Sequence, residues 1–266
     1  MSIQSRHFIL TMGRSGSNTL VNVLNQHPEL LNLGEVLGEW TKFRRLQRRL
    51  RLHGRSDAAY LDALLNNKLL IRALVSYRSF NYRRRGEPDG VKSFHRIKSL
   101  GMKEFSLNMH RFGVSSFLKE RPEIKVIGLQ RHNILDRFIS ARMLQQTGIV
   151  AVGKGQKEST EGLQLNPMTL HDDLDVIERE NRELAAMLDA LPQERVYRIA
   201  YEDLYSTEQR TREILREVYD FLGVEPIEPV MKMRKIIPGR SIERIQNIDA
   251  CREALRGTRF EWVLAS

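Results

Sequence analysis

The sequence predicts an α/β fold, a three-layer sandwich in which helices cover both faces of a central parallel sheet of about five strands. Two observations lead to this prediction: strand-like apolar runs alternate with helix-like periodic segments, and the first run passes through a turn of small residues directly into a helix. The chain has 266 residues, 41% hydrophobic and 29% charged, enough to bury the core of such a fold. We expect residues 1–266 to form a single domain.

Five segments are expected to form the strands of this sheet. The first is a continuous apolar run (HFILTM), the pattern of a strand that is buried on both faces of a parallel sheet. The other runs are similar in length and are followed by glycine or polar residues. The predicted strands are residues 7–12, 30–33, 90–94, 125–130 and 195–200.

Helical periodicity follows several of these strands. Apolar residues from Leu20 onward recur at helical spacing until His27-Pro28 ends the pattern. Three longer helices are predicted at residues 136–146, 172–191 and 207–222, the last followed by a glycine, Gly223, at the position that commonly ends a helix.

Positive charge is concentrated in two places. Lysine and arginine outnumber acidic residues by 43 to 33, a net charge of +10, which favours an anionic partner. The clusters are residues 83–85 and residues 42–55, where the apolar spacing predicts an amphipathic helix with a basic face. That helix is interpreted as a solvated surface, or as an attractor of an acidic acceptor or anionic membrane surface. Nucleic acid is the least favoured partner, because no nucleic-acid-binding motif is present.

Several classes of protein and site are disfavoured. No apolar segment approaches the ~20 residues of a membrane-spanning helix, and the apolar run at residues 8–12 is too short for a signal peptide, so we expect a cytoplasmic protein. The single cysteine, Cys251, cannot form an internal disulfide and has no metal-ligand spacing around it, so no metal is expected. Residues 148–168 lack periodicity and predict a mobile loop near the substrate, or else a simple surface insertion.

The turn after the first strand is suited to binding a phosphate group. It runs Gly13, Arg14, Ser15, Gly16, Ser17, Asn18, Thr19 and leads into a helix, whose dipole and free N–H groups favour an anion. It is not a Walker loop, because the sequence G-x-x-x-x-G-K-[ST] is absent. A helix-capping turn without a ligand is the alternative interpretation.

A second candidate anion-binding element follows the predicted strand at residues 125–130. Arg131 comes directly after that strand, and Ser140 lies nine positions later on the following helix. Ligands of open α/β sheets bind beyond the carboxyl ends of the strands, which is also where the first turn is expected. We therefore expect Arg131 and Ser140 to share one anion.

Together these elements resemble the sulfotransferases that use 3′-phosphoadenosine 5′-phosphosulfate (PAPS), in particular the bacterial branch related to nodulation-factor and glycolipid sulfotransferases. Residues 14–19 are similar to the 5′-phosphosulfate loop of that family, and residues 131–140 to its 3′-phosphate element. The spacing selects Arg131 in the bacterial pattern and His132 in that of the cytosolic animal enzymes. We prefer Arg131, because a guanidinium binds phosphate bidentately and stays charged. The resemblance spans most of the chain and implies a P-loop-like fold.

The resemblance also implies roles for individual residues. Arg14 is expected to neutralise the departing phosphate, and Glu35 matches the glutamate that serves as base in the bacterial branch. His95 and Glu39 are the other candidates for the base. Lys92, on the predicted strand at residues 90–94, is expected to steady the transferring sulfonate.

The remaining expectations concern cofactor and acceptor. Lys235 belongs to a basic segment of the kind that relatives fold over the 3′-phosphate, and no metal is required by the expected chemistry. The acceptor is expected to be a hydroxyl of a carbohydrate, glycolipid or small-molecule alcohol, an expectation that rests on analogy alone. Two alternatives stay open: a nucleotide-dependent phosphotransferase, and a non-catalytic binder of nucleic acid or acidic lipid.

Overall fold

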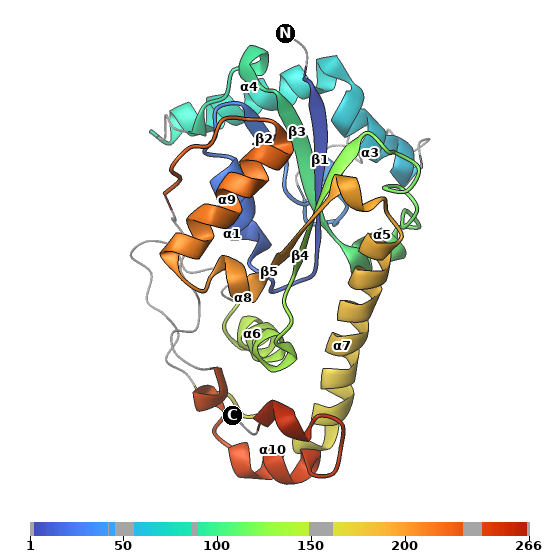
Figure 1. Cartoon of the computed structure of the whole chain (residues 1–266), viewed down its shortest axis with the longest axis vertical. Helices are drawn as coiled ribbons and strands as arrows, with labels where there is room; N and C mark the ends of the chain where they lie inside the picture. Colours follow the sequence, from blue (N-terminus) through green and yellow to red (C-terminus); the bar gives the residue numbers. More distant parts are fainter. Residues whose placement is uncertain are drawn as a thin grey trace.

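A parallel sheet in the strand order β2-β3-β1-β4-β5 forms the centre of the protein (Figure 1). The computed structural model describes residues 3–41, 43–45, 56–86, 90–148, 162–230 and 241–264. Within these residues the strands of the sheet are β1 (Ser5–Thr11), β2 (Leu30–Asn32), β3 (Ser99–Phe105), β4 (Ile124–Gln130) and β5 (Val196–Ala200). The predicted α/β class and the parallel sheet are confirmed.

One of the predicted strands is wrong. Residues 90–94 lie outside the sheet, where Phe94–Arg96 form a short 3₁₀ helix, and the strand between β2 and β1 is β3, a few residues further on. The apolar pattern of β3 is interrupted by Lys103 and Glu104, both of which are buried. A loop far away in sequence supplies an ion-pair partner for Lys103 and amide donors for Glu104, and no local pattern reveals this.

Helices cover both faces of the sheet. Alternate residues of β1 point to opposite sides, so that Phe8 and Leu10 enter one core and Ile9 enters another. The first core is closed by α3 (Asp57–Asn66), α4 (Lys68–Arg84), α5 (Ser106–Arg111) and the end of α7 (Pro167–Asp189). The second core is closed by α1 (Ser17–Leu24), α8 (Tyr201–Leu204) and α9 (Glu208–Leu222).

The predicted long helices are confirmed, and their ends follow local chemistry. The helix α6 (Ile134–Thr147) begins where the Asn133 side chain accepts a hydrogen bond from Asp136 N–H. Helix α7 begins with Pro167 after the capping residue Asn166, and α9 ends at Gly223, whose φ of 77° is in the left-handed region. No helix in the described part of the chain has both the length and the apolar character needed to cross a membrane.

A third core lies at the lower end of the molecule in Figure 1, where α10 (Ile248–Leu255) packs against α7 and the 3₁₀ helix Ser241–Arg244 packs against α6. Leu163 N–H donates to the Arg244 carbonyl at 2.7 Å. The Asn247 side-chain amide accepts a hydrogen bond from Leu165 N–H and donates one to the Leu165 carbonyl. Residues 162–166, the described end of the loop predicted at 148–168, are therefore held by backbone pairing. Residues 149–161 of that loop, and all of the predicted helix at 42–55 except residues 43–45, lie outside the described residues.

The contact between Gly101 of β3 and His7 of β1 makes a testable prediction about stability. A Cβ atom on Gly101 would lie 2.3 Å from the backbone oxygen of His7, and the His7 ring fills the remaining space. Gly101→Ala should therefore lower the free energy of unfolding by about 1–3 kcal/mol in urea titrations. Gly13→Ala is the control, because nothing lies within 4 Å of its added Cβ. Equal stability of the two variants would contradict this packing.

Candidate active site

The β1–α1 loop (residues 12–16) has an unusual backbone that its surroundings impose. Arg14 has a φ of 67° and Gly16 a φ of 73°, both in the left-handed region. An arginine in this region is uncommon, and such conformations persist only where the structure enforces them. A Cβ atom on Gly16 would lie 2.7 Å from the Tyr205 ring, whose hydroxyl donates to the Gly16 carbonyl at 3.0 Å. This position therefore requires glycine.

The same loop presents hydrogen-bond donors at the start of α1. The amides of Thr19 and Leu20 donate to the Gly16 carbonyl, whereas the amides of the first turn before them have no helical carbonyl to reach. The Ser15 hydroxyl is fully buried and has no hydrogen-bond partner among the described residues. Because an unsatisfied buried hydroxyl is costly, this arrangement is suited to a bound anion.

The structure brings the two predicted phosphate elements together. Arg14 Nε donates to Ser140 Oγ at 3.0 Å, and Arg131 Nη1 donates to the Arg14 carbonyl at 3.2 Å. Burial lowers the pKa of Arg14, and the nearby charge of Arg131 lowers it further. Two guanidinium groups thus share a partly buried region, where an anion would relieve their repulsion.

Side chains of α6, α7 and α8 hold Arg131 in place. Its guanidinium lies 4.3 Å from the centre of the Tyr201 ring and pairs with Asp136 at 3.2 Å. The Asn181 side chain of α7 donates to the Arg131 carbonyl at 3.0 Å. One atom, Arg131 Nε, is buried and lacks a partner within the residues that the structure describes. Arg131 is therefore oriented by the protein and retains a donor for a ligand.

A second charged group lies at the carboxyl edge of the sheet, after β2. The Glu35 carboxylate pairs with the ammonium group of Lys103 and accepts a hydrogen bond from Trp40 Nε1 at 3.1 Å. Burial lowers the pKa of Lys103, and the charge of Glu35 opposes this shift in part. The Lys103 ammonium also lies 4.2 Å from the centre of the Phe105 ring. Lys103 is a functional candidate that the sequence analysis missed, because β3 was predicted too early in the chain.

Lys92 and His95 do not lie with these groups. Lys92 Nζ donates to the carbonyl of His27, which precedes β2, and Lys98 N–H donates to the carbonyl of Glu29 at 2.8 Å. These contacts place residues 92–98 at the amino edge of the sheet, opposite the β1–α1 loop. Lys235, the other predicted ligand residue, lies outside the described residues.

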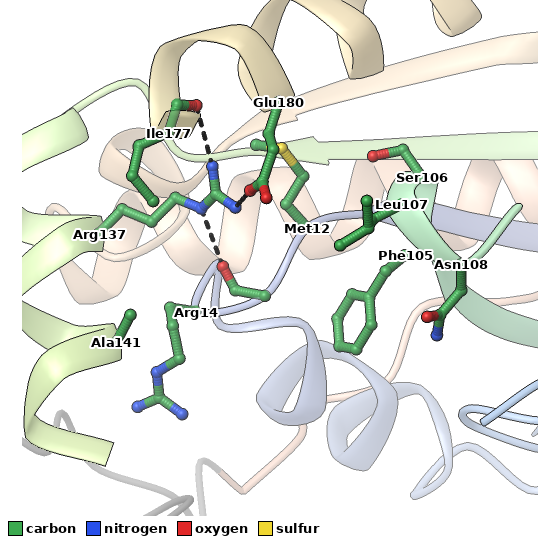
Figure 2. A pocket seen from close by; sticks show the side chains of 11 residues that line it. Met12, Arg14, Phe105, Ser106, Leu107, Asn108, Arg137, Ala141, Ile177 and Glu180 are labelled. Atoms are coloured by element: carbon green, nitrogen blue, oxygen red, sulfur yellow. Dashed lines mark hydrogen bonds and ion pairs between the residues drawn. The ribbon is translucent and has the colours of Figure 1, made fainter. Parts of the chain in front are cut away.

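A cavity of about 270 Å³ adjoins the loop (Figure 2). Arg137 Nε donates to the Gly13 carbonyl at 3.0 Å, and its guanidinium pairs with Glu180 at the cavity wall. Among the described residues, no group of three or more His, Cys, Asp or Glu side chains could hold a metal ion. The cavity is lined by Met12, Gly13, Arg14, Phe105, Ser106, Leu107, Asn108, Arg137, Ala141, Ile177 and Glu180.

Comparisons with known proteins find one family match and several remote structural similarities. A sequence model of the sulfotransferase family matches residues 7–229. The sulfotransferase domain of the Synechococcus PCC 7002 olefin synthase is 19% identical with a TM-score of 0.43, over 86% of this chain and 76% of its own. The sulfotransferase domain of the curacin biosynthetic pathway is 20% identical with a TM-score of 0.44, over 94% of this chain and 83% of its own. A sulfotransferase from Alicyclobacillus acidocaldarius is 15% identical with a TM-score of 0.46, over 100% of this chain and 97% of its own. None of the curated proteins compared with the chain matches it.

The buried position of Lys92 predicts a pH dependence of stability. Burial and the charges of Arg78 and Arg96 lower the pKa of Lys92 to about 7, from an ordinary value of 10.5. Between these values the unfolded chain binds a proton that the folded chain releases, so the free energy of unfolding increases as the pH rises. Lys92→Met should show a smaller increase than the unmodified protein in urea titrations at pH about 7, 8 and 9.

Lys98→Met is the matched control, because Lys98 is half-exposed and pairs with Glu29 at the surface. Its pH dependence should follow that of the unmodified protein. Parallel curves for all three proteins would contradict the assigned burial of the Lys92 ammonium group.

Proposed function

The chain belongs to the sulfotransferase family, and on this basis we propose that it transfers a sulfuryl group from PAPS to a hydroxyl group of an acceptor. The observation that carries the proposal is the meeting of the β1–α1 loop with Arg131 and Ser140, through the hydrogen bonds of Arg14. PAPS has phosphate groups at both ends of its ribose. Two anion-binding elements side by side at one sheet edge are suited to that pattern.

The proposed donor contacts follow from the unsatisfied groups of the site. The loop residues Ser15, Gly16, Ser17, Asn18 and Thr19 would hold the 5′-phosphosulfate, with the buried Ser15 hydroxyl gaining the partner that it lacks among the described residues. Arg131 Nε and Ser140 would hold the 3′-phosphate. Lys235 is proposed as a further contact to that phosphate.

The chemistry needs a proton acceptor and positive charge near the sulfur. When bound, PAPS supplies the sulfuryl group, whose bond to the 5′-phosphate breaks as the bond to the acceptor oxygen forms. Arg14, at the turn of the loop, would stabilise the negative charge that grows on the phosphate side. Glu35 would accept the proton of the acceptor hydroxyl, because its carboxylate is partly exposed at the carboxyl edge of the sheet, beside the buried ammonium group of Lys103.

Lys103 would take the role expected from sequence for Lys92, whose side chain lies at the other edge of the sheet. The ammonium group of Lys103 is buried, and its ion pair with the Glu35 carboxylate stabilises its positive charge. Once Glu35 has accepted a proton, its attraction for Lys103 falls. The negative charge of the transferring sulfonate would then replace the Glu35 carboxylate as the partner of the ammonium group and be stabilised by it.

The cavity beside the loop favours one kind of acceptor. Met12, Phe105, Leu107, Ala141 and Ile177 make most of its lining apolar. A sugar would leave several hydroxyl groups without partners against such a surface, at a cost for each. Of the acceptors expected from sequence, the cavity therefore favours a small-molecule alcohol that presents an apolar portion. Its volume of about 270 Å³ is slightly below the roughly 300–1,000 Å³ that is typical of ligand pockets.

Arg131 tests the donor site. Arg131→Ala should weaken binding of 3′,5′-adenosine bisphosphate by about ten- to hundred-fold in calorimetry, the loss expected for one charge-assisted hydrogen bond to a phosphate. Arg96→Ala, at the amino edge of the sheet, is the control and should bind normally. Unchanged affinity of Arg131→Ala for the bisphosphate would contradict the assignment of Arg131 to the 3′-phosphate. Tighter binding of ATP with magnesium than of the bisphosphate would favour a phosphotransferase.

Glu35 tests the chemical step. Glu35→Gln keeps the shape of the side chain and removes its basicity, so the single-turnover rate at saturating PAPS should fall by about 10²–10⁴ while donor affinity barely changes. Lys103→Met should also lower the rate. His95→Asn should leave it unchanged, because His95 lies at the opposite edge of the sheet. A large loss in His95→Asn with a normal Glu35→Gln would transfer the role to His95.

A further inference from the structure

Helix α4 exposes large apolar side chains to solvent on one face. Leu69 is 78% exposed, Tyr77 57% and Phe80 63%. Their spacing, with the exposed Ala73 between them, places all four on the same side of the helix. The opposite side carries the buried residues Ile71, Leu74 and Val75, which belong to the core. Solvent-facing aromatic and leucine side chains on a helix whose other face is packed indicate an interaction surface.

The helix that carries this face is strongly basic. Residues 68–85 contain six lysine or arginine residues and no acidic residue, and the acids Glu87 and Asp89 that follow lie outside the described residues. Arg78 turns inward and stacks on the Tyr82 ring, 5.1 Å from its centre. The exposed cations of the helix and its end are Lys68, Arg72, Arg83, Arg84 and Arg85.

We propose that this face of α4 binds peripherally to a membrane that contains anionic phospholipids. Phe80, Tyr77 and Leu69 would enter the headgroup region, and the arginines beside them would contact lipid phosphates. Basic flanks around an apolar strip are complementary to such a surface, which offers negative charge above a hydrocarbon layer. A two-fold contact between copies of the chain would instead bring arginines of like charge together.

The position of α4 agrees with simultaneous donor binding. In Figure 1 the helix lies at the upper end of the molecule, whereas α6, which carries Ser140, lies in the lower half. Membrane attachment through α4 would leave the β1–α1 loop open to water, so PAPS could still reach it. The proposal does not depend on the proposed function, because it concerns a different surface.

The test uses the full chain and vesicles of phosphatidylcholine, with or without phosphatidylserine, in a sedimentation assay. We expect binding to the phosphatidylserine vesicles, little binding to phosphatidylcholine alone, and loss of binding as salt screens the charges. The double variant Tyr77→Ser/Phe80→Ser should bind these vesicles at least about tenfold more weakly than the unmodified protein. Arg83→Gln/Arg84→Gln should lose about fivefold per charge removed.

Two variants on other surfaces serve as controls. Trp262→Ser removes an aromatic side chain that is 63% exposed near the C-terminus, and Arg216→Gln removes an exposed charge from α9. Both should bind vesicles as the unmodified protein does. Retained binding of 3′,5′-adenosine bisphosphate, or an unchanged melting temperature, would show that the α4 variants are folded.

Several outcomes would overturn the proposal. One is the absence of binding to phosphatidylserine vesicles at low salt. Another is undiminished binding of the Tyr77→Ser/Phe80→Ser variant, which would place the lipid contact elsewhere. Binding to an oligonucleotide that the α4 variants lose, without vesicle binding, would assign the face to nucleic acid. A dimer in sedimentation equilibrium that Phe80→Ser dissociates would assign it to self-association.

Discussion

The hydrogen bond from Arg14 Nε to Ser140 Oγ joins the two halves of the candidate site, and the remaining contacts are arranged around it. It connects the turn after β1 to helix α6, which follows the neighbouring strand β4. Arg131 reinforces the connection through the Arg14 carbonyl, and Arg137 does so through the Gly13 carbonyl. The loop is thus held open by side chains of another βα unit, and its backbone amides stay available at the start of α1.

Buried charge positions the segment that carries Glu35. The Glu104 carboxylate accepts hydrogen bonds from the amides of Val36 and Leu37, both at 2.6 Å, and from Asn108 at 3.0 Å. Burial raises the pKa of Glu104, and these donors oppose that shift by stabilising the carboxylate. The amides belong to the segment that begins with Glu35. A buried carboxylate in β3 therefore fixes the loop whose own carboxylate pairs with Lys103, one residue earlier in the strand.

The C-terminal segment completes the lower end of the molecule outside the matched family region. Residues 241–264 lie beyond residue 229, where that match ends, and pack on α6 and α7 around a core of their own. Both helices also line the cavity beside the loop, through Arg137, Ala141, Ile177 and Glu180. The segment therefore supports the outer sides of the helices whose inner sides form part of the candidate acceptor pocket.

Local sequence determined the α/β class, four of the strands, the long helices and the turn at residues 13–19, because apolar period, capping residues and small residues act over short distances. It also indicated the pairing of that turn with Arg131 and Ser140, since parallel strands bring their carboxyl ends to one edge. Only the tertiary structure decided the position of β3 and the partner of Glu35. The charges of Lys103 and Glu104 oppose burial locally, and their compensation comes from a loop about seventy residues away, which only folding brings into contact.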